Sequence, residues 1–181
     1  MNKQALNFFK TAEQYVKTNF NDEMLKVENR RFEDQNAEGF LRQCIYVVVN
    51  SGMPNQVAAK ILERFYESGS NPNTIGHPNK RKAITQAPLK YKEWFEALQS
   101  SNDKIEYLES LPMMGPTIKY HLARNMGIDC AKPDRHLKRL AERFGYSEVQ
   151  TMCEELAKES GYRTGTVDVI LWRYCNMQPD Y

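Results

Sequence analysis

Residues 111–137 have the sequence LPMMGPTIKYHLARNMGIDCAKPDRHL, which carries the strongest structural signal in the chain. The proline and glycine within Leu111–Gly115 predict a tight hairpin, because these residues favour turns for different steric reasons. Ile118, Leu122 and Met126 follow at four-residue steps, which is typical of one face of a helix. A shorter apolar pattern precedes the hairpin. The segment therefore predicts two helices joined by a hairpin.

Apolar residues recur at helical spacing on both sides of this hairpin. Residues 40–49 are apolar on most sides, which predicts a helix buried at the centre of a bundle. Val47–Val49 is the best candidate for a strand, but no alternating partner strand appears elsewhere. Farther along the chain, Ser147 with Gln150 predicts a capping box at a helix start. We therefore expect an all-α chain.

The composition of the 181 residues is that of a globular protein, with 41% hydrophobic and 27% charged residues. No apolar run approaches the roughly 20 residues that span a bilayer. The first residues lack a continuous apolar segment and a small-residue cleavage site, so we expect no signal peptide. We expect a cytoplasmic monomer without a membrane partner, nucleoid-associated in a bacterium or nuclear in a eukaryote.

The four cysteines are scattered through the chain without a C-x-x-C pair. This spacing argues against a zinc ribbon or an iron–sulfur cluster. We therefore expect buried thiols at the four positions Cys44, Cys130, Cys153 and Cys175.

The net charge of +2 is too small to indicate a nucleic-acid partner, but the cations are clustered. One cluster lies in residues 116–139 and comprises Lys119, Arg124, Lys132, Arg135, Lys138 and Arg139. A second comprises Lys80, Arg81, Lys82, Lys90 and Lys92. From charge alone, a solvated helix face and a phosphate-binding face are equally good interpretations.

The hairpin and the segment after it resemble the helix-hairpin-helix DNA glycosylase superfamily. Its signature is a leucine-proline-x-x-glycine hairpin followed, after one helix and a short loop, by an aspartate. In this chain the hairpin is Leu111–Gly115 and the aspartate is Asp134, within the sequence Lys-Pro-Asp-Arg-His. The resemblance implies a two-lobed all-α fold. We expect a central lobe of residues 31–128, and a second lobe of residues 1–30 and 129–181 that carries Asp134.

The resemblance also implies a function, the excision of a damaged, modified or mismatched base from double-stranded DNA. In the resembled enzymes the aspartate faces the sugar of a nucleotide that is flipped out of the duplex. There it stabilises the positive charge that develops as the glycosidic bond breaks. Asp134 also stands where a helix N-cap is expected, worth about 1 kcal/mol, and both roles are compatible.

Further site residues follow from the resemblance. Gly115 would let a DNA backbone come close, and amides at the start of a helix from Pro116 would hold phosphate oxygens. The resembled enzymes bind a monovalent cation, K+ or Na+, through hairpin carbonyls, here those of Leu111 and Met114; we expect no other cofactor. The DNA-binding candidates are Met113, Gly115, Thr117, Lys119, Arg124, Lys132, Arg135 and His136, with Met53 and Asn55 as a wedge in an upstream turn.

The chain departs from the family pattern at two points. Bifunctional members have a Schiff-base lysine two residues after the hairpin glycine, where this chain has Thr117. We therefore expect hydrolysis by water rather than lyase chemistry, with Lys132 as the candidate substitute amine. The iron–sulfur cluster common in the family is also missing. Two alternatives stay open, an enzyme that modifies pyrimidines in DNA and a non-enzymatic module that binds DNA structure.

The last helical pattern has a polar interruption at Asp168 and Arg173, within VDVILWRYC. A buried structural ion pair between these two side chains is the interpretation that we favour.

Overall fold

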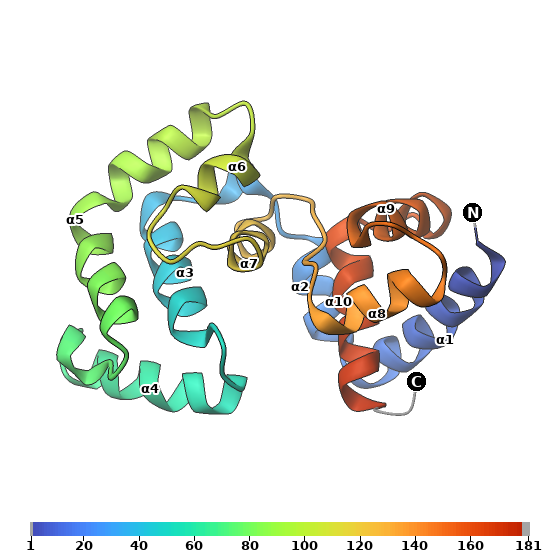
Figure 1. The fold of residues 1–181 in the computed structure, drawn as a ribbon, viewed down its shortest axis with the longest axis horizontal. Helices are drawn as coiled ribbons and strands as arrows, with labels where there is room; N and C mark the ends of the chain where they lie inside the picture. The colour runs from blue at the N-terminus through green and yellow to red at the C-terminus, as the bar shows by residue number, and fades with distance from the viewer. Residues whose placement is uncertain (1, 179–181) are drawn as a thin grey trace. The chain divides into compact units, whose positions relative to one another are not determined.

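The computed structural model describes residues 2–178, and Figure 1 shows their arrangement. Among these residues there are ten α-helices, two short 3-10 helices and no strand. The prediction of an all-α chain is therefore confirmed. Within the same range, no helix combines the length and the apolar character needed to cross a membrane.

The chain divides into two compact units. One comprises Met1–Glu33 together with Gly127–Tyr181, and we call it the discontinuous unit. The other comprises Asp34–Met126, and we call it the hairpin unit because it contains residues 111–115.

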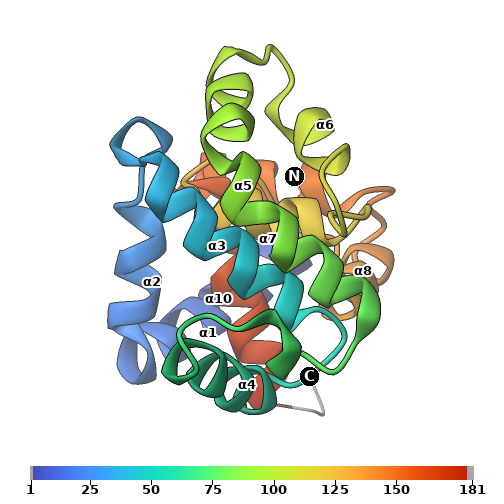
Figure 2. The ribbon, with the colours of Figure 1, turned by 90° about the vertical axis from the view of Figure 1, so that its left-hand side faces the viewer.

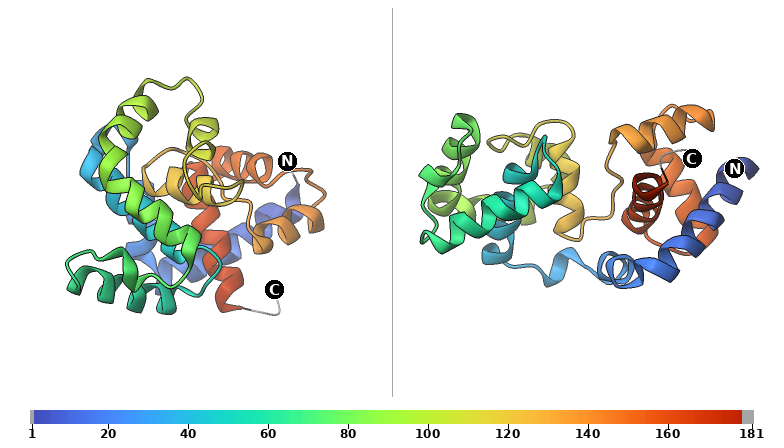
Figure 3. Two further views of the ribbon diagram at one scale, coloured as in Figure 1. Left: turned by 60° about the vertical axis from the view of Figure 1, so that its left-hand side comes forward. Right: turned by 90° about the horizontal axis from the view of Figure 1, so that it is seen from below.

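The discontinuous unit is built around its last helix, α10. The helices of this unit are α1 (Lys3–Asn19), α2 (Asn21–Glu28), α8 (Arg135–Arg143), α9 (Val149–Ser160) and α10 (Thr164–Met177). The four other helices all contact α10, and Figure 3 (right) looks along α10 with α1 and α9 beside it. Every residue of α10 from Thr164 to Leu171 is buried. An apolar helix of this kind forms a core only when other helices cover all its sides.

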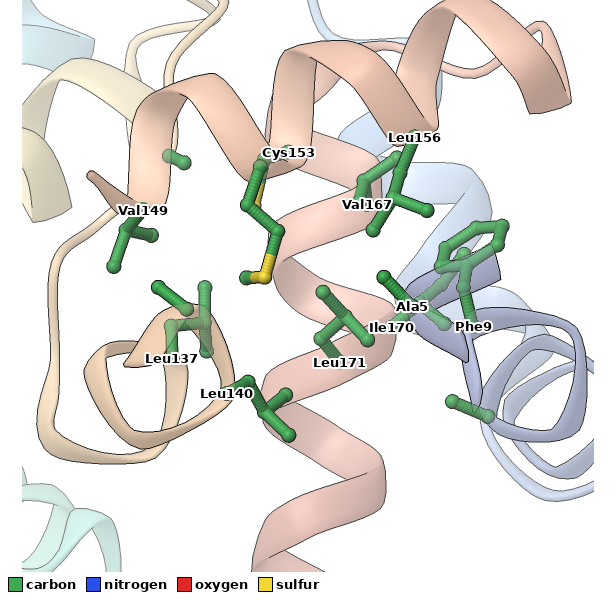
Figure 4. Close-up of a cluster of buried hydrophobic side chains, with 14 of the residues drawn as sticks. Ala5, Phe9, Leu137, Leu140, Val149, Cys153, Leu156, Val167, Ile170 and Leu171 are labelled. Atoms are coloured by element: carbon green, nitrogen blue, oxygen red, sulfur yellow. The ribbon is translucent and has the colours of Figure 1, made fainter. Parts of the chain in front are cut away.

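The core of this unit includes side chains from all five of its helices, and Figure 4 shows those of α1, α8, α9 and α10 converging. Leu137 and Leu140 of α8 are fully buried, as expected from their spacing of three residues on one helix face. They lie in one cluster with Phe9 of α1, Leu156 of α9 and Ile170 of α10. Packing within this cluster fixes the position of α8, and α8 carries Asp134 at its start.

The hairpin unit contains the helices that flank residues 111–115. Its helices are α3 (Ala37–Asn50), α4 (Asn55–Glu67), α5 (Pro78–Ser100), α6 (Lys104–Glu109) and α7 (Ile118–Asn125), with 3-10 turns at Phe32–Asp34, which straddles the unit boundary, and Pro72–Thr74. Helices α3 and α5 lie side by side, as Figure 2 shows. Val47, Val48 and Val49 lie in α3 and are buried, which confirms a buried helix there rather than a strand.

The four cysteines are free thiols and all are buried, as predicted. Burial raises the pKa of Cys44 and that of Cys153, so neither thiol ionises easily. These residues therefore behave as small apolar side chains.

Two local predictions are wrong. Helix α9 has Glu148 rather than Ser147 as its N-cap, and no side chain caps it. Gln150 instead uses its oxygen to accept a hydrogen bond from the Ala131 amide at 2.8 Å.

The expected Asp168–Arg173 pair is also absent. Asp168 accepts a hydrogen bond from the Lys132 amide, and Arg173 pairs with Glu23 at 2.5 Å. Five residues apart on a helix, the two side chains point to different sides.

Arg163 ties three segments of the discontinuous unit together. Its guanidinium donates hydrogen bonds to the carbonyls of Gly127, at 2.7 Å, and of Arg30, and its Nε lies 3.8 Å from the Asp129 carboxylate. These acceptors lie on the two stretches of chain that connect this unit to the hairpin unit in sequence. Arg163 therefore satisfies carbonyls at the point where the chain leaves the unit and where it returns.

Gly127 makes this close approach possible. Its φ is +80°, and a Cβ at this position would lie 2.5 Å from the carbonyl carbon of Arg31 and 2.7 Å from the amide nitrogen of Phe32. Both neighbouring atoms belong to the backbone, so they cannot move as the end of a side chain can. Glycine is required at 127 by its conformation and also by the lack of space.

We predict that Gly127→Ala destabilises the protein more than Gly145→Ala, its matched control. Gly145 has a similar φ of +75° but no atom of the described chain within 4 Å of the Cβ position. Gly145→Ala should lower the free energy of unfolding by about 1–2 kcal/mol, because alanine disfavours the left-handed backbone. Gly127→Ala should lower it by about 1–3 kcal/mol more, because its Cβ also overlaps with backbone atoms. Urea denaturation of the two variants measures the difference, and equal losses would contradict the assignment.

Candidate functional site

The loop before α8 is held by hydrogen bonds that its backbone amides donate to two side chains of the same unit. The Ala131 amide donates to Gln150 of α9, and the Lys132 amide donates to the carboxylate of Asp168. Asp168 is only 1% exposed and lies on the central helix α10. A buried carboxylate is stable only with such partners. Asp168 therefore fixes the chain two residues before Asp134, a positioning role that the sequence did not reveal.

Pro133 completes this loop with a tight turn. The Asp134 amide donates to the Lys132 carbonyl at 2.8 Å, so three residues close a γ-turn around the proline. The fixed φ of proline suits this turn. The hydrogen bond of the Asp134 amide and the rigid Pro133 therefore both restrict the backbone on the N-terminal side of Asp134.

Asp134 is the N-cap of α8. Its backbone is extended (φ −83°, ψ 176°), and its Oδ1 accepts hydrogen bonds from the amides of His136 at 2.9 Å and Leu137 at 3.1 Å. The capping role expected from the sequence is confirmed. Both bonds use the same oxygen, so the cap does not engage Oδ2. The carboxylate is half-buried and lies at the positive end of the α8 dipole.

Basic residues surround this carboxylate in the sequence of α8. Arg135 is the first helical residue and is exposed, as are Lys138 and Arg139. His136 is half-buried, and burial lowers its pKa more than the nearby Asp134 carboxylate raises it. The imidazole is therefore predominantly neutral near pH 7. Lys132 is also half-buried. The first two turns of α8 thus present one carboxylate among several cations.

The hairpin is anchored through its apolar side chains. Leu111 and Met114 are buried, and the Met114 amide donates to the Leu111 carbonyl at 3.1 Å. Together with Pro112 they line a small apolar void with side chains of α3 and α5 that include Cys44, Ile45, Val48, Ala83 and Ile84. Because the Leu111 carbonyl already accepts one hydrogen bond, it would offer a cation only its second lone pair. The monovalent cation stays a prediction.

At two hairpin positions the residue type does not match what the backbone favours. Met113 has a φ of 65°, in the left-handed region that glycine adopts without steric cost. Gly115 has no positive φ, and among the described residues nothing lies within 4 Å of its Cβ position. The fold alone would therefore favour glycine at 113 and would accept a side chain at 115.

The helix after the hairpin begins later than expected. We predicted a start at Pro116, whereas α7 begins at Ile118 with Thr117 as its N-cap. The Thr117 side chain makes no capping hydrogen bond. The amides at the start of α7 therefore receive no side-chain acceptor from Thr117.

The basic candidates of α7 are less open than the sequence suggested. The Lys119 ammonium forms an ion pair with Glu109 across the hairpin, and this hydrogen bond raises the pKa of Lys119. Arg124 is half-buried. A phosphate at Lys119 would therefore compete with an existing partner.

The turn with Met53 and Asn55 is held by Lys80, a member of the second basic cluster. The Lys80 ammonium donates to the carbonyls of Val49 at 2.9 Å and Ser51 at 2.5 Å, and Lys80 is only 6% exposed. Burial lowers the pKa of Lys80, whereas carbonyls at the negative end of α3 favour the ammonium form. Asn55 accepts a hydrogen bond from Asn50 at 2.5 Å, across the same turn.

The sequence did contain a signal for Lys80. Ala83, Ile84 and Ala87 are buried on one face of α5, and Lys80 lies three, four and seven residues before them. These steps place Lys80 on the same face. The second basic cluster is therefore not one continuous exposed face, because Lys80 points inward and Arg81 donates to the Ile75 carbonyl at 3.0 Å.

The fold is similar to that of the 8-oxoguanine DNA glycosylase of Thermotoga maritima, with a TM-score of 0.73 and 16% sequence identity over 95% of this chain and 96% of that one. It is equally similar to the 8-oxoguanine DNA glycosylase of Methanocaldococcus jannaschii, with a TM-score of 0.73 and 16% identity over 99% and 97% of the two chains. The chain has the helix-hairpin-helix DNA glycosylase fold.

The predicted fold class is confirmed by this similarity over nearly the full length of all three chains. No family model matches the sequence, and no curated protein matches it either. The likeness is therefore one of backbone architecture, which many unrelated sequences can share.

We predict that Lys80→Met lowers stability by about 2 kcal/mol, because two carbonyls lose a charged donor. Lys82→Met is the matched control: Lys82 lies on the same helix and is exposed, so its loss should change stability by less than about 0.5 kcal/mol. Hydrogen exchange at Ser51 and Met53, whose amides donate to the carbonyls of Val47 and Asn50, should be faster in Lys80→Met alone. Equal stability of the two variants would show that Lys80 does not hold the turn.

Proposed function

We propose that the protein is a DNA glycosylase that hydrolyses the N-glycosidic bond of a damaged, modified or mismatched base. The observation that carries this proposal is the position of Asp134. It is the N-cap of α8, after the hairpin, in a chain whose fold matches two DNA glycosylases over nearly its whole length. Fold alone does not define chemistry, so the proposal depends on what this carboxylate does.

Asp134 would act on the sugar of an extruded nucleotide. As the bond between C1′ and the base nitrogen breaks, its electron pair leaves with the base and positive charge develops on the sugar. The Asp134 carboxylate would stabilise this charge, and water would then add to C1′ and lose a proton to the carboxylate or to solvent. The hydrogen bonds at Oδ1 preorganise the group, while Oδ2 lies outside the cap.

Duplex DNA would be held through phosphates. The proposed contacts are the hairpin backbone at Gly115 and the side chains of Lys119, Arg124, Lys132, Arg135 and His136, with Met53 and Asn55 in the upstream turn as the wedge. Gly115 supports this assignment, because the fold does not require glycine there and a close phosphate backbone would. The exposed cations Lys138 and Arg139 on α8 would add non-specific attraction.

The first substrate to test is 8-oxoguanine paired with cytosine, since both similar structures are 8-oxoguanine DNA glycosylases. Duplexes that contain other oxidised, alkylated, deaminated or mismatched bases complete the panel. Mass spectrometry of small molecules released from each duplex identifies the base. Release of no base from any duplex would argue against a glycosylase, and altered pyrimidines retained in the strand would favour the pyrimidine-modifying alternative.

We predict that Asp134→Asn lowers the single-turnover rate of base release at least about a hundredfold, because a preorganised charge is lost. Asparagine is also a good N-cap, so the melting temperature and the affinity for duplex DNA should change little. Glu142→Gln, which removes an exposed carboxylate from the same helix, is the control and should retain the wild-type rate. A wild-type rate in folded Asp134→Asn would remove Asp134 from the mechanism.

A second prediction follows from Thr117, which offers no amine to the sugar. The product should be an intact strand with an abasic site, and borohydride should trap no covalent protein–DNA adduct. Gel electrophoresis without heat or alkali measures strand cleavage directly. A trapped adduct that disappears in Lys132→Ala would instead assign a lyase reaction to that lysine.

The non-enzymatic alternative predicts a different result. It would be favoured by duplex binding that occurs without base release and is unaffected by Asp134→Asn.

A further inference from the structure

We propose that the Met113 side chain is an apolar contact to the deoxyribose backbone of bound duplex DNA, retained at the cost of a strained hairpin. This inference rests on the DNA-binding function proposed above. Met113 has a φ of 65°, which residues other than glycine, asparagine and aspartate rarely adopt. Strained residues of this kind cluster at functional sites.

The backbone of the hairpin does not favour methionine at this position. Two neighbours, Leu111 and Met114, are buried and anchor the hairpin, whereas Met113 is only half-buried. The hydrogen bond from the Met114 amide to the Leu111 carbonyl closes the turn through backbone atoms alone. Glycine at 113 would keep this bond and relieve the strain.

At Gly115, two residues later, the residue type and the backbone conformation disagree in the opposite sense. Its backbone would tolerate a side chain and its Cβ position is open among the described residues, yet it is glycine. The hairpin therefore lacks a side chain where the fold permits one and has a large side chain where the fold disfavours one. Both choices are explained by one external partner that approaches the backbone closely at 115 and contacts a side chain at 113.

The chemistry of methionine indicates which part of DNA it would meet. Its side chain is flexible, uncharged and apolar, so it does not bind phosphate oxygens. Deoxyribose presents C–H groups between successive phosphates, and a side chain beside amides that hold a phosphate would lie against the adjoining sugar. Such a contact strengthens binding to all sequences alike. It displaces no counterions, so it contributes nothing to the salt dependence of binding.

Ser70 provides the matched control. It is the other non-glycine residue with a positive φ among the described residues, at 64°, and it lies in the loop after α4. Ser70→Gly and Met113→Gly therefore relieve the same backbone conformation at two places. Met113→Leu retains an apolar side chain at 113, and Met113→Asn replaces it with a polar one that tolerates a positive φ.

The experiment measures the affinity of the full chain for a duplex with a tetrahydrofuran abasic analogue, by fluorescence anisotropy over a range of salt concentrations. We expect Met113→Gly and Met113→Asn to bind about tenfold more weakly, as for the loss of a partly buried apolar contact. The slope of log affinity against log salt should stay at the wild-type value. Met113→Leu and Ser70→Gly should bind like the wild type, and Met113→Gly should melt no lower than the wild type.

Three results would overturn the inference. Wild-type affinity in Met113→Gly would show that the side chain contacts no DNA. A flatter salt slope in Met113→Gly would show that phosphate contacts were lost through a distorted hairpin, and a much lower melting temperature would assign the side chain to packing. Absence of duplex binding by the wild-type protein would overturn the proposed DNA function as well, so the two failures are distinguishable.

Discussion

The structure depends on Arg163, because a unit made from two distant parts of the chain must be closed where those parts meet. The Arg163 guanidinium bonds to the carbonyls of Gly127 and Arg30 and lies near Asp129. Gly127 permits the backbone at residues 31–32 to lie within van der Waals distance of its own. With these segments fixed, residues 128–134 form a short connection, and the position of α8 follows from its packing on α10.

The candidate catalytic carboxylate is placed by the same interactions that stabilise the helix. Asp134 caps α8 through Oδ1, Pro133 restricts its backbone, and the buried Asp168 holds the preceding loop. Each of these contacts lies within the discontinuous unit. A preorganised charge avoids reorganisation during the reaction, which is the main advantage of electrostatic catalysis.

Basic residues that look alike in the sequence have different roles in the structure. Lys80 is a buried cap for the end of α3, and Lys119 pairs with Glu109, whereas Arg135 and its neighbours on α8 are exposed. A lysine has a long apolar stem, so its charge can lie far from the position of its Cα. Charge counts in a sequence therefore overestimate the surface that is free to bind phosphate.

The sequence by itself determined the all-α class, the buried helix α3, the hairpin and the N-cap at Asp134, because each depends on residues within about one or two helical turns. Only the tertiary structure decided the partners of Asp168, Arg173, Lys80 and Gln150, since each is more than fifteen residues away in sequence. It also decided that Met113 adopts a left-handed backbone. Local periodicity specifies which face of a helix is buried, but long-range packing selects the atoms that meet there.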